Sequence, residues 1–179
     1  MMRIVMNAMD RWVGWPRRFL IRRNDGQPYI ERWTFLDHPA LTVKLQRIMA
    51  SDGQHPHCHP WNFWSIILVG AYTEELFPRG PALPPTIVQS GWLSTRRRDS
   101  HLCHRVTIRR TTWTLLIGGR RHRVWGFHIP EKELPRLMGN ERWRVKAGHN
   151  IEACLIHAGC AFVPWQFYID VPFCPAGVP

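Results

Sequence analysis

A histidine-rich stretch, Gln54-His55-Pro56-His57-Cys58-His59-Pro60-Trp61, has the residue types that most directly suggest chemistry. Residues two apart in an extended chain face the same side, so His57 and His59 place two imidazoles on one face, with His55 as a third. Two imidazole nitrogens on one face can bind the same metal ion. The stretch therefore predicts a metal site. The alternatives are a solvated turn flanked by prolines, or a site that has lost its metal.

His104, far along the chain, can supply the next ligand. In an extended segment, His104 lies on the same face as Val106 and Ile108, because these residues are two and four positions along the chain. This apolar face is expected to point inward, and an inward-facing histidine needs a polar partner, which a metal ion would provide. We therefore expect His104 to join His57 and His59 as a metal ligand.

The elements that must position these histidines are short apolar runs separated by Pro and Gly, of which the chain has 15 and 13. Such punctuation, with period-two alternation, is typical of an antiparallel all-β domain. The runs 63–69 and 71–77, joined by Gly70, are expected to form a hairpin. One helix is expected at 131–138. The predicted strands are 29–35, 41–48, 63–69, 71–77, 91–98, 104–109, 112–117 and 122–127.

Length and composition indicate one domain. The chain has 179 residues, 45% of them hydrophobic and 10 of them Trp, which excludes disorder as its main state. We expect an N-terminal segment at 1–27, a β-barrel at 28–130 and a C-terminal extension at 131–179. The chain has neither the roughly 18 consecutive apolar residues of a membrane span nor a signal-peptide pattern. We therefore expect a cytoplasmic protein without membrane association.

The net charge of +11 comes from 24 Lys and Arg against 13 Asp and Glu. A basic surface favours anionic partners, and the Arg-rich runs 96–98, 109–110 and 120–123 form either an ordinary exposed face or an anion footprint. No nucleic-acid-binding module is recognisable, so nucleic acid is a possible but not a favoured partner. The five cysteines include no CxxC pair, and Cys58 and Cys103 are expected to be small buried thiols.

Several motifs in a fixed order resemble the cupin superfamily, whose small β-barrels hold a metal ion inside. The closer resemblance is to uncharacterised bacterial and phage cupin-like proteins, and it spans roughly residues 28 to 130. The motifs are Arg32-Trp33, His57-Cys58-His59-Pro60-Trp61, Gly70-Ala71-Tyr72-Thr73-Glu74, Cys103-His104-Arg105, Trp113-Thr114-Leu115 and Trp125-Gly126-Phe127-His128.

The resemblance implies a single cupin-type antiparallel β-barrel, a double-stranded β-helix or jelly roll, with short terminal extensions. It also implies a homodimer as a possible assembly. The sequence departs from the usual cupin pattern where a carboxylate ligand is expected, because Phe63 and Trp64 occupy those positions. The implied ligand set is therefore His57, His59 and His104.

The function that these features favour is a metal-dependent cupin-type enzyme, a non-haem Fe(II) oxygenase or dioxygenase that acts on a small molecule, either neutral or anionic. Three neutral imidazoles suit Fe(II), Zn, Ni, Mn or Cu, and Fe(II) is the ion favoured for the oxygenase that the resemblance suggests. Tyr72 and Glu74 are the catalytic candidates, although Glu74 can equally be a rim carboxylate paired with an Arg. The alternative function is a non-catalytic module that binds a sugar, a nucleotide or nucleic acid through its Arg-rich surface. Aromatic residues expected in the core are Trp61, Trp64, Tyr72, Trp113 and Trp125.

Overall fold

The structure, a computed structural model, describes residues 10–12, 14–23, 26–78, 80, 83–130, 133, 155–157 and 160–164. All regular elements in this part of the chain are β-strands, and every strand pairing is antiparallel. The prediction of an antiparallel all-β fold is thus confirmed. The helix expected at 131–138 lies outside the described residues except for Glu133.

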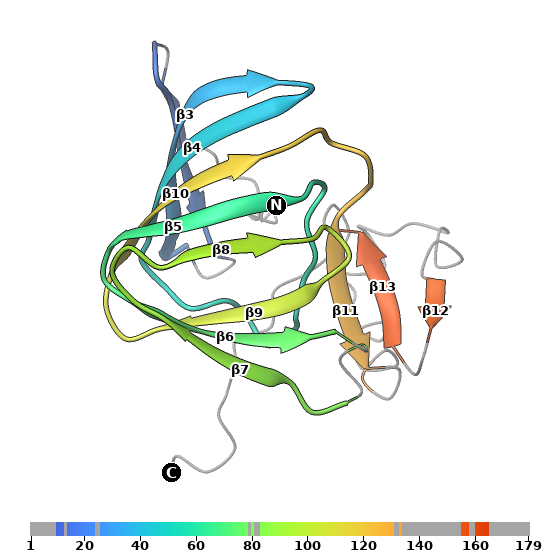
Figure 1. Cartoon of the computed structure of the whole chain (residues 1–179). Helices are drawn as coiled ribbons and strands as arrows, with labels where there is room; N and C mark the ends of the chain where they lie inside the picture. The colour runs from blue at the N-terminus through green and yellow to red at the C-terminus, as the bar shows by residue number, and fades with distance from the viewer. Residues whose placement is uncertain are drawn as a thin grey trace.

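One layer is a seven-stranded sheet with the order β1-β2-β3-β4-β10-β5-β8 (Figure 1). Two of its strands, β1 and β2, precede residue 28. In the order of the sheet, the strands are β1 (Asp10–Trp12), β2 (Arg17–Arg22), β3 (Pro28–His38), β4 (Leu41–Ile48), β10 (Thr112–Gly118), β5 (Phe63–Val69) and β8 (Thr95–Arg98).

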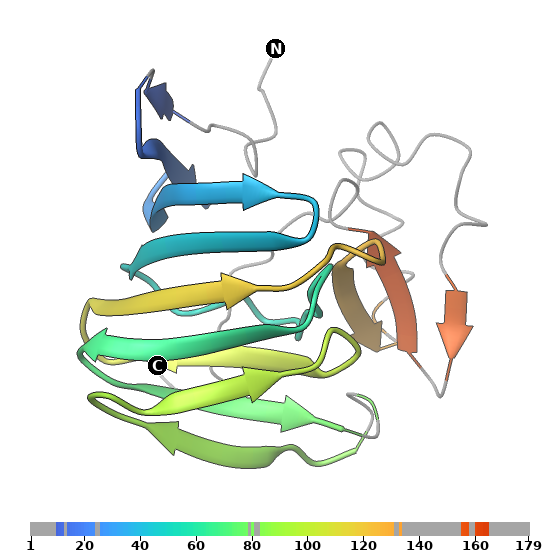
Figure 2. The same cartoon turned by 45° about the horizontal axis from the view of Figure 1, so that its top comes forward.

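The other layer consists of two three-stranded sheets, with the orders β7-β6-β9 and β11-β13-β12. Isolated bridges from His57 to His104 on β9 and to Phe127 on β11 join them. The histidine-rich stretch therefore runs like a short strand between these two sheets. In the tilted view β11 and β13 stand beside the ends of the other strands (Figure 2). The strands are β7 (Thr86–Ser90), β6 (Tyr72–Phe77), β9 (Cys103–Ile108), β11 (Gly126–Pro130), β13 (Cys160–Pro164) and β12 (Leu155–His157).

The predicted hairpin around Gly70 is wrong. β5 pairs with β10 and β8, whereas β6 pairs with β7 and β9, so the chain passes from one layer to the other at this turn. Gly70 has a φ of 89°, and a Cβ there would lie 2.7 Å from Thr112 Oγ1. A residue without a side chain is required where the chain turns so closely against β10.

The face of β4 that points to the interior is the polar one. Thr42, Lys44 and Gln46 are buried, whereas Val43 and Leu45 on the opposite face remain half-buried. Alternation predicted the strand at 41–48, but it does not by itself say which face is inside. The space between the two layers is accordingly lined by polar as well as apolar side chains.

The outer face of the seven-stranded sheet is covered by its own aromatic and basic side chains. The rings of Trp33 and Trp113 stack at 5.3 Å between centroids. Arg18 and Arg47 lie over these two rings and both pair with the buried carboxylate of Glu31. This arrangement shields the apolar outer surface without a further layer.

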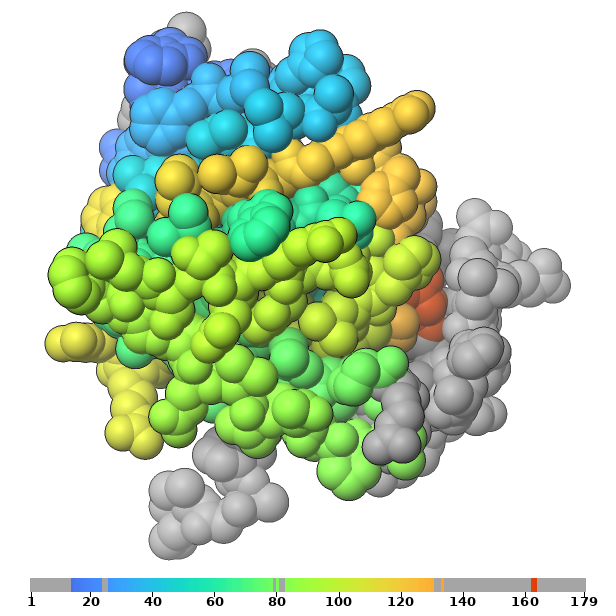
Figure 3. Space-filling view, viewed as in Figure 1, coloured from blue at the N-terminus to red at the C-terminus, as the bar shows by residue number. Residues whose placement is uncertain are grey.

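Of the aromatic residues expected in the core, Trp61 and Tyr72 are buried. The expectation is wrong for Trp64, which is 48% exposed on the outer face of β5. On the side of the molecule seen in Figure 3, side chains cover the region of strands β5, β8, β6 and β7. The described residues include no helix that is long and apolar enough to cross a membrane.

Candidate metal centre

Backbone hydrogen bonds fix the histidine-rich stretch against both neighbouring sheets. His57 and His104 exchange two of them, each 2.9 Å from N to O. On the other side the Cys58 amide donates to the carbonyl of Gly126 at 3.0 Å. Because His57 and Cys58 alternate, the imidazole and the thiol point in opposite directions. Cys58 and Cys103 are both buried, as predicted.

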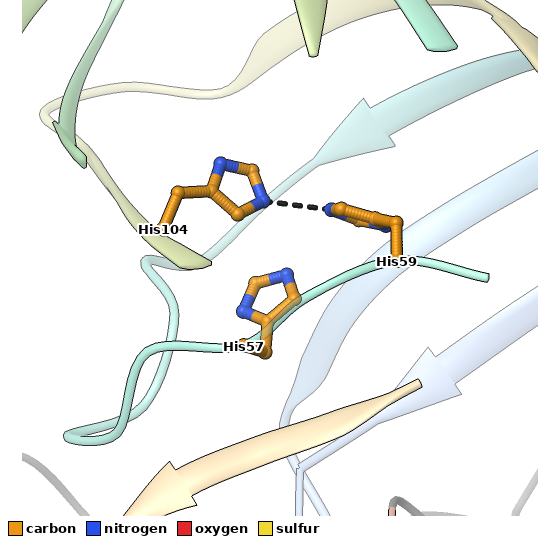
Figure 4. Close-up of side chains that lie close together, drawn as sticks. All are labelled: His57, His59 and His104. Atoms are coloured by element: carbon orange, nitrogen blue, oxygen red, sulfur yellow. Dashed lines mark hydrogen bonds between the residues drawn. The ribbon is translucent and has the colours of Figure 1, made fainter. Parts of the chain in front are cut away.

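The structure brings together the three histidines that the sequence singled out (Figure 4). One ligand nitrogen from each of His57, His59 and His104 lies within 4.8 Å of the others. The Nε2 atoms of His59 and His104 face each other at 2.7 Å. Three imidazoles from two distant segments of the chain thus converge on one point in the interior.

The local environment keeps two of these imidazoles neutral. Burial lowers the pKa of His57 to about 4, although the charge of Asp52 opposes the shift. Burial also lowers the pKa of His59 well below its ordinary value, and the nearby His104, His57 and Arg32 lower it further. Neutral imidazole retains the nitrogen lone pair that a metal ion requires.

A buried carboxylate orients His104. Glu74 is 1% exposed, and its Oε1 lies 2.5 Å from His104 Nδ1. Arg98 holds the same carboxylate through Nε at 2.9 Å and Nη2 at 2.5 Å. Burial alone would raise the pKa of Glu74, but the hydrogen bonds and charges of His104 and Arg98 outweigh it and lower the pKa to about 2.

The ionised Glu74 therefore accepts a hydrogen bond from His104 Nδ1. In the neutral ring this leaves the lone pair on Nε2, which faces His59. A carboxylate behind a histidine is the usual way in which proteins fix the tautomer of a metal ligand. In the metal-free protein a proton between the facing Nε2 atoms of His59 and His104 joins the two rings, and a metal ion would replace that proton.

A second carboxylate, Asp52, braces the stretch from outside the histidine group. Its Oδ2 accepts from the Val106 amide at 2.6 Å and lies 3.7 Å from His57 Nδ1. Its Oδ1 accepts from the Tyr29 hydroxyl. Asp52 thus ties β3, β9 and the histidine-rich stretch together.

Aromatic rings surround the histidines on two sides. Phe63 lies 4.5 Å from the His59 ring, between centroids, and Phe127 lies 5.7 Å from that of His57. Trp125 lies 6.3 Å from His57. These apolar walls limit the access of water to the imidazole nitrogens.

The donor set fits a divalent metal ion. Two nitrogens each about 2.1 Å from one ion are at most about 4.2 Å apart. The widest separation in the group, 4.8 Å, exceeds this limit only slightly, so a small rotation of one ring closes the set. Neutral imidazoles, a carboxylate behind one of them and a dry surrounding are the features of such a site.

Other candidate residues do not join the three histidines. His55 is buried, but its Nε2 lies 3.1 Å from Glu133 Oε2. Tyr72 shares a face of β6 with Glu74 but lies two residues farther from the position opposite His104. Its catalytic role stays a prediction, as does that of Glu74.

Sequence reasoning did not identify Asp52 and Arg98 as parts of this site. Asp52 carried one usable signal, since it is a lone acid five residues before His57 in a basic chain. Arg98 belongs to a run of three arginines that was expected to be exposed, yet only alternate residues of β8 face outward. The inward-facing Arg98 holds Glu74, whereas Arg97 is exposed.

Comparisons with known proteins add likenesses of fold. The chain matches no protein-family model and no curated protein. Similar solved structures include a cupin superfamily protein from Desulfitobacterium hafniense DCB-2, with 9% identity over 51% of this chain and 77% of that one and a TM-score of 0.43. KdgF from Halomonas sp. shows 19% identity over 51% and 80%, with a TM-score of 0.41. Fe(II) HppE shows 12% identity over 56% of each chain, with a TM-score of 0.47, so this chain spans just over half of its length. With TM-scores this low, the function must be argued from this chain's own side chains.

Proposed function

We propose that the protein is a metal-dependent enzyme of the cupin type, and that its chemistry is that of a non-haem Fe(II) oxygenase acting on a small molecule. The observation that carries the proposal is the convergence of His57, His59 and His104, with Glu74 behind His104. A purely structural histidine cluster would not need three rings turned toward one point.

Three neutral protein ligands leave coordination positions open, and bound Fe(II) would supply oxygen activation there. The chain's own residues do the rest. Glu74 keeps the proton of His104 on Nδ1, and Phe63 with Phe127 keeps water from the ligand nitrogens. Zn, Ni, Mn and Cu suit the same donor set, so the metal and the reaction are tested separately.

The proposed location is the cytoplasm. Its reducing conditions keep thiols free, which agrees with the free thiol of Cys58. The same conditions keep iron in the ferrous form that the proposed reaction requires.

The first test measures metal content by elemental analysis after anaerobic loading with Fe(II) and, separately, with each alternative ion. We expect close to one ion per chain in the wild type and strong loss in His57→Ala and His104→Ala. His101→Ala is the matched control, because this exposed histidine is only three residues from His104 and outside the metal group.

The second test measures oxygen consumption of the Fe(II) form with a panel of small organic acids and phosphorylated compounds. Metal-dependent uptake that is lost in His57→Ala would support the oxygenase. A wild type that takes up no metal would overturn the enzyme proposal and favour the non-catalytic binding module. Turnover without oxygen, with another ion, would overturn only the oxygenase.

A further inference from the structure

Two cations on inward-facing strand positions, the half-buried Arg32 and the buried Lys44, have no carboxylate partner among the residues that the structure describes. They sit on β3 and β4, where Arg32 pairs across the strands with Gln46, and Lys44 with Thr34. Lys44 is only 7% exposed. Charged side chains are rarely buried unless they are paired, because removal from water is costly.

The contacts of Arg32 leave part of its guanidinium unused. The Gln46 side-chain oxygen, in the amide orientation that satisfies both groups, accepts from Arg32 Nε at 2.9 Å and from Nη2 at 2.6 Å. An amide does not neutralise the charge. The Nη1 donors have no acceptor among the described residues, and burial lowers the pKa of Arg32.

Lys44 has fewer polar contacts than Arg32 among the described residues. Its Nζ lies 4.7 Å from the centroid of the Trp61 ring, and no described residue accepts a hydrogen bond from it. Burial, together with the charge of Arg32, lowers its pKa to about 8, so the ammonium is still charged at neutral pH. The charge of Asp37 reaches Lys44, but that carboxylate is ion-paired with Arg17.

The contrast with Glu74 shows that the chain can neutralise an interior cation. Arg98 is held by the Glu74 carboxylate, whereas no described carboxylate holds Arg32 or Lys44 in this way. Both unneutralised cations are close to the histidines. Arg32 lies opposite Gln46, two residues from Lys44 on the same face of β4, and the ring beneath Lys44 belongs to Trp61, two residues after His59.

Trp61 adds an unsatisfied donor at the same place. Its indole ring is buried, and its Nε1 has no hydrogen-bond acceptor in the described part of the chain. A buried N–H group without an acceptor is uncommon in folded proteins. An oxygen-rich anion would complete the hydrogen bonding of this region.

We infer that Arg32 and Lys44 form an anion-binding subsite beside the three histidines, and that the substrate is a small molecule with a carboxylate or phosphoryl group. The inference builds on the proposed function and gives it a substrate class. The anionic group accepts from Lys44 Nζ and Arg32 Nη1, which leaves the rest of the molecule directed toward the metal centre. It also moves the expected anion site from the Arg-rich surface to the interior.

Calorimetric titration of the metal-free protein with inorganic phosphate and with malonate, at constant ionic strength and pH 7, tests this inference. We expect one site per chain for at least one probe, and the preferred probe identifies the anionic group. Lys44→Met and Arg32→Gln should weaken binding at least 10-fold. Arg109→Gln, which removes one charge from an exposed position, should leave the affinity unchanged.

A thermal unfolding scan guards against misfolded variants. Removing an unpaired buried cation should leave the unfolding temperature of Lys44→Met equal to that of the wild type or higher, and phosphate or malonate should no longer raise it. Absence of binding of both probes to the wild type would overturn the inference. So would a folded Lys44→Met that binds as the wild type does.

Metal analysis of the same samples separates this inference from the proposed function. If Lys44→Met retains its metal but loses the anion, both are supported. If the wild type binds the anion at Arg32 and Lys44 but takes up no metal, the subsite stands and the enzyme proposal fails. If it binds metal but no anion, only the subsite fails.

Discussion

Acid should destabilise the metal-free protein strongly because its interior holds histidines that are neutral when folded. Burial lowers the pKa of His57 and of His128 to about 4 in the folded state, against an ordinary value of 6.5. Above pH 6.5 both states leave these rings neutral, and the fold is fully favoured. As the pH falls from 6.5 toward 4, the unfolded chain takes up protons that the folded chain does not, so stability is lost.

The size of the effect follows from the two pKa values. One proton taken up by the unfolded state alone lowers the free energy of unfolding by about 1.4 kcal/mol for each pH unit. At pH 5 the loss is about 2 kcal/mol for His57 and about 2 kcal/mol for His128. His59 adds to it in the same direction. A total of about 4 kcal/mol is a large part of the roughly 5–15 kcal/mol that stabilises an ordinary domain.

Urea unfolding of the metal-free protein at pH 7, 6 and 5, followed by tryptophan fluorescence, measures this loss. His57→Gln should show a shallower dependence on pH, by about 1.2 kcal/mol between pH 6 and 5. His38→Gln, which changes an exposed histidine outside the group, is the matched control and should follow the wild type.

The pH at which stability is lost also distinguishes the contribution of the histidines from that of Glu74. The pKa of Glu74 is about 2 when folded, against an ordinary value of 4.5, so its contribution is present above pH 4.5 and is lost only as the pH falls toward 2. A free energy of unfolding that stays constant between pH 7 and 5 would refute the reasoning about buried neutral histidines. An unchanged slope in His57→Gln would refute its assignment to that residue.

Two further substitutions test the support of the site and the turn between the layers. Glu74→Gln removes the charge that faces His104, so we expect a loss of about 3 kcal/mol in urea unfolding and a 10- to 100-fold weaker metal affinity by competition with a chelator. Wild-type metal affinity in this variant would show that Glu74 has no positioning role. Gly70→Ala should lower the unfolding temperature more than Gly26→Ala, because both have positive φ but a Cβ at Gly70 also meets β10 whereas one at Gly26 meets nothing within 4 Å. Equal losses in thermal scans would contradict the steric contribution.

The sequence was informative about the histidines because their placement depends on local rules. The spacing of His57 and His59 needs only an extended chain, and the inward direction of His104 follows from its apolar neighbours. Both rules hold within a few residues and do not depend on which strands pair. The all-β class was predictable for the same reason, since Pro, Gly and alternation act locally.

The supporting groups were not predictable because they depend on pairing between distant strands. Glu74 reaches His104 only because β6 pairs with β9 in one register, with Leu76 opposite His104 and Glu74 opposite Val106. A shift of one residue would turn Glu74 to the outer face. The false hairpin at Gly70 has the same origin, because adjacent strands in sequence were assumed to be partners in space.

The polar interior has a consequence for stability that links the two proposals. On β4 the apolar Val43 and Leu45 face outward, whereas Lys44 and Gln46 are buried on the inward face. Packing of the interior therefore contributes less to folding than in an ordinary β-sandwich, and unpaired charge there opposes it. A metal ion and an anion that bind only the folded chain would each stabilise it by mass action. The two effects should add when both are bound, and a substrate anion that also contacts the metal would make their sum larger than the separate contributions.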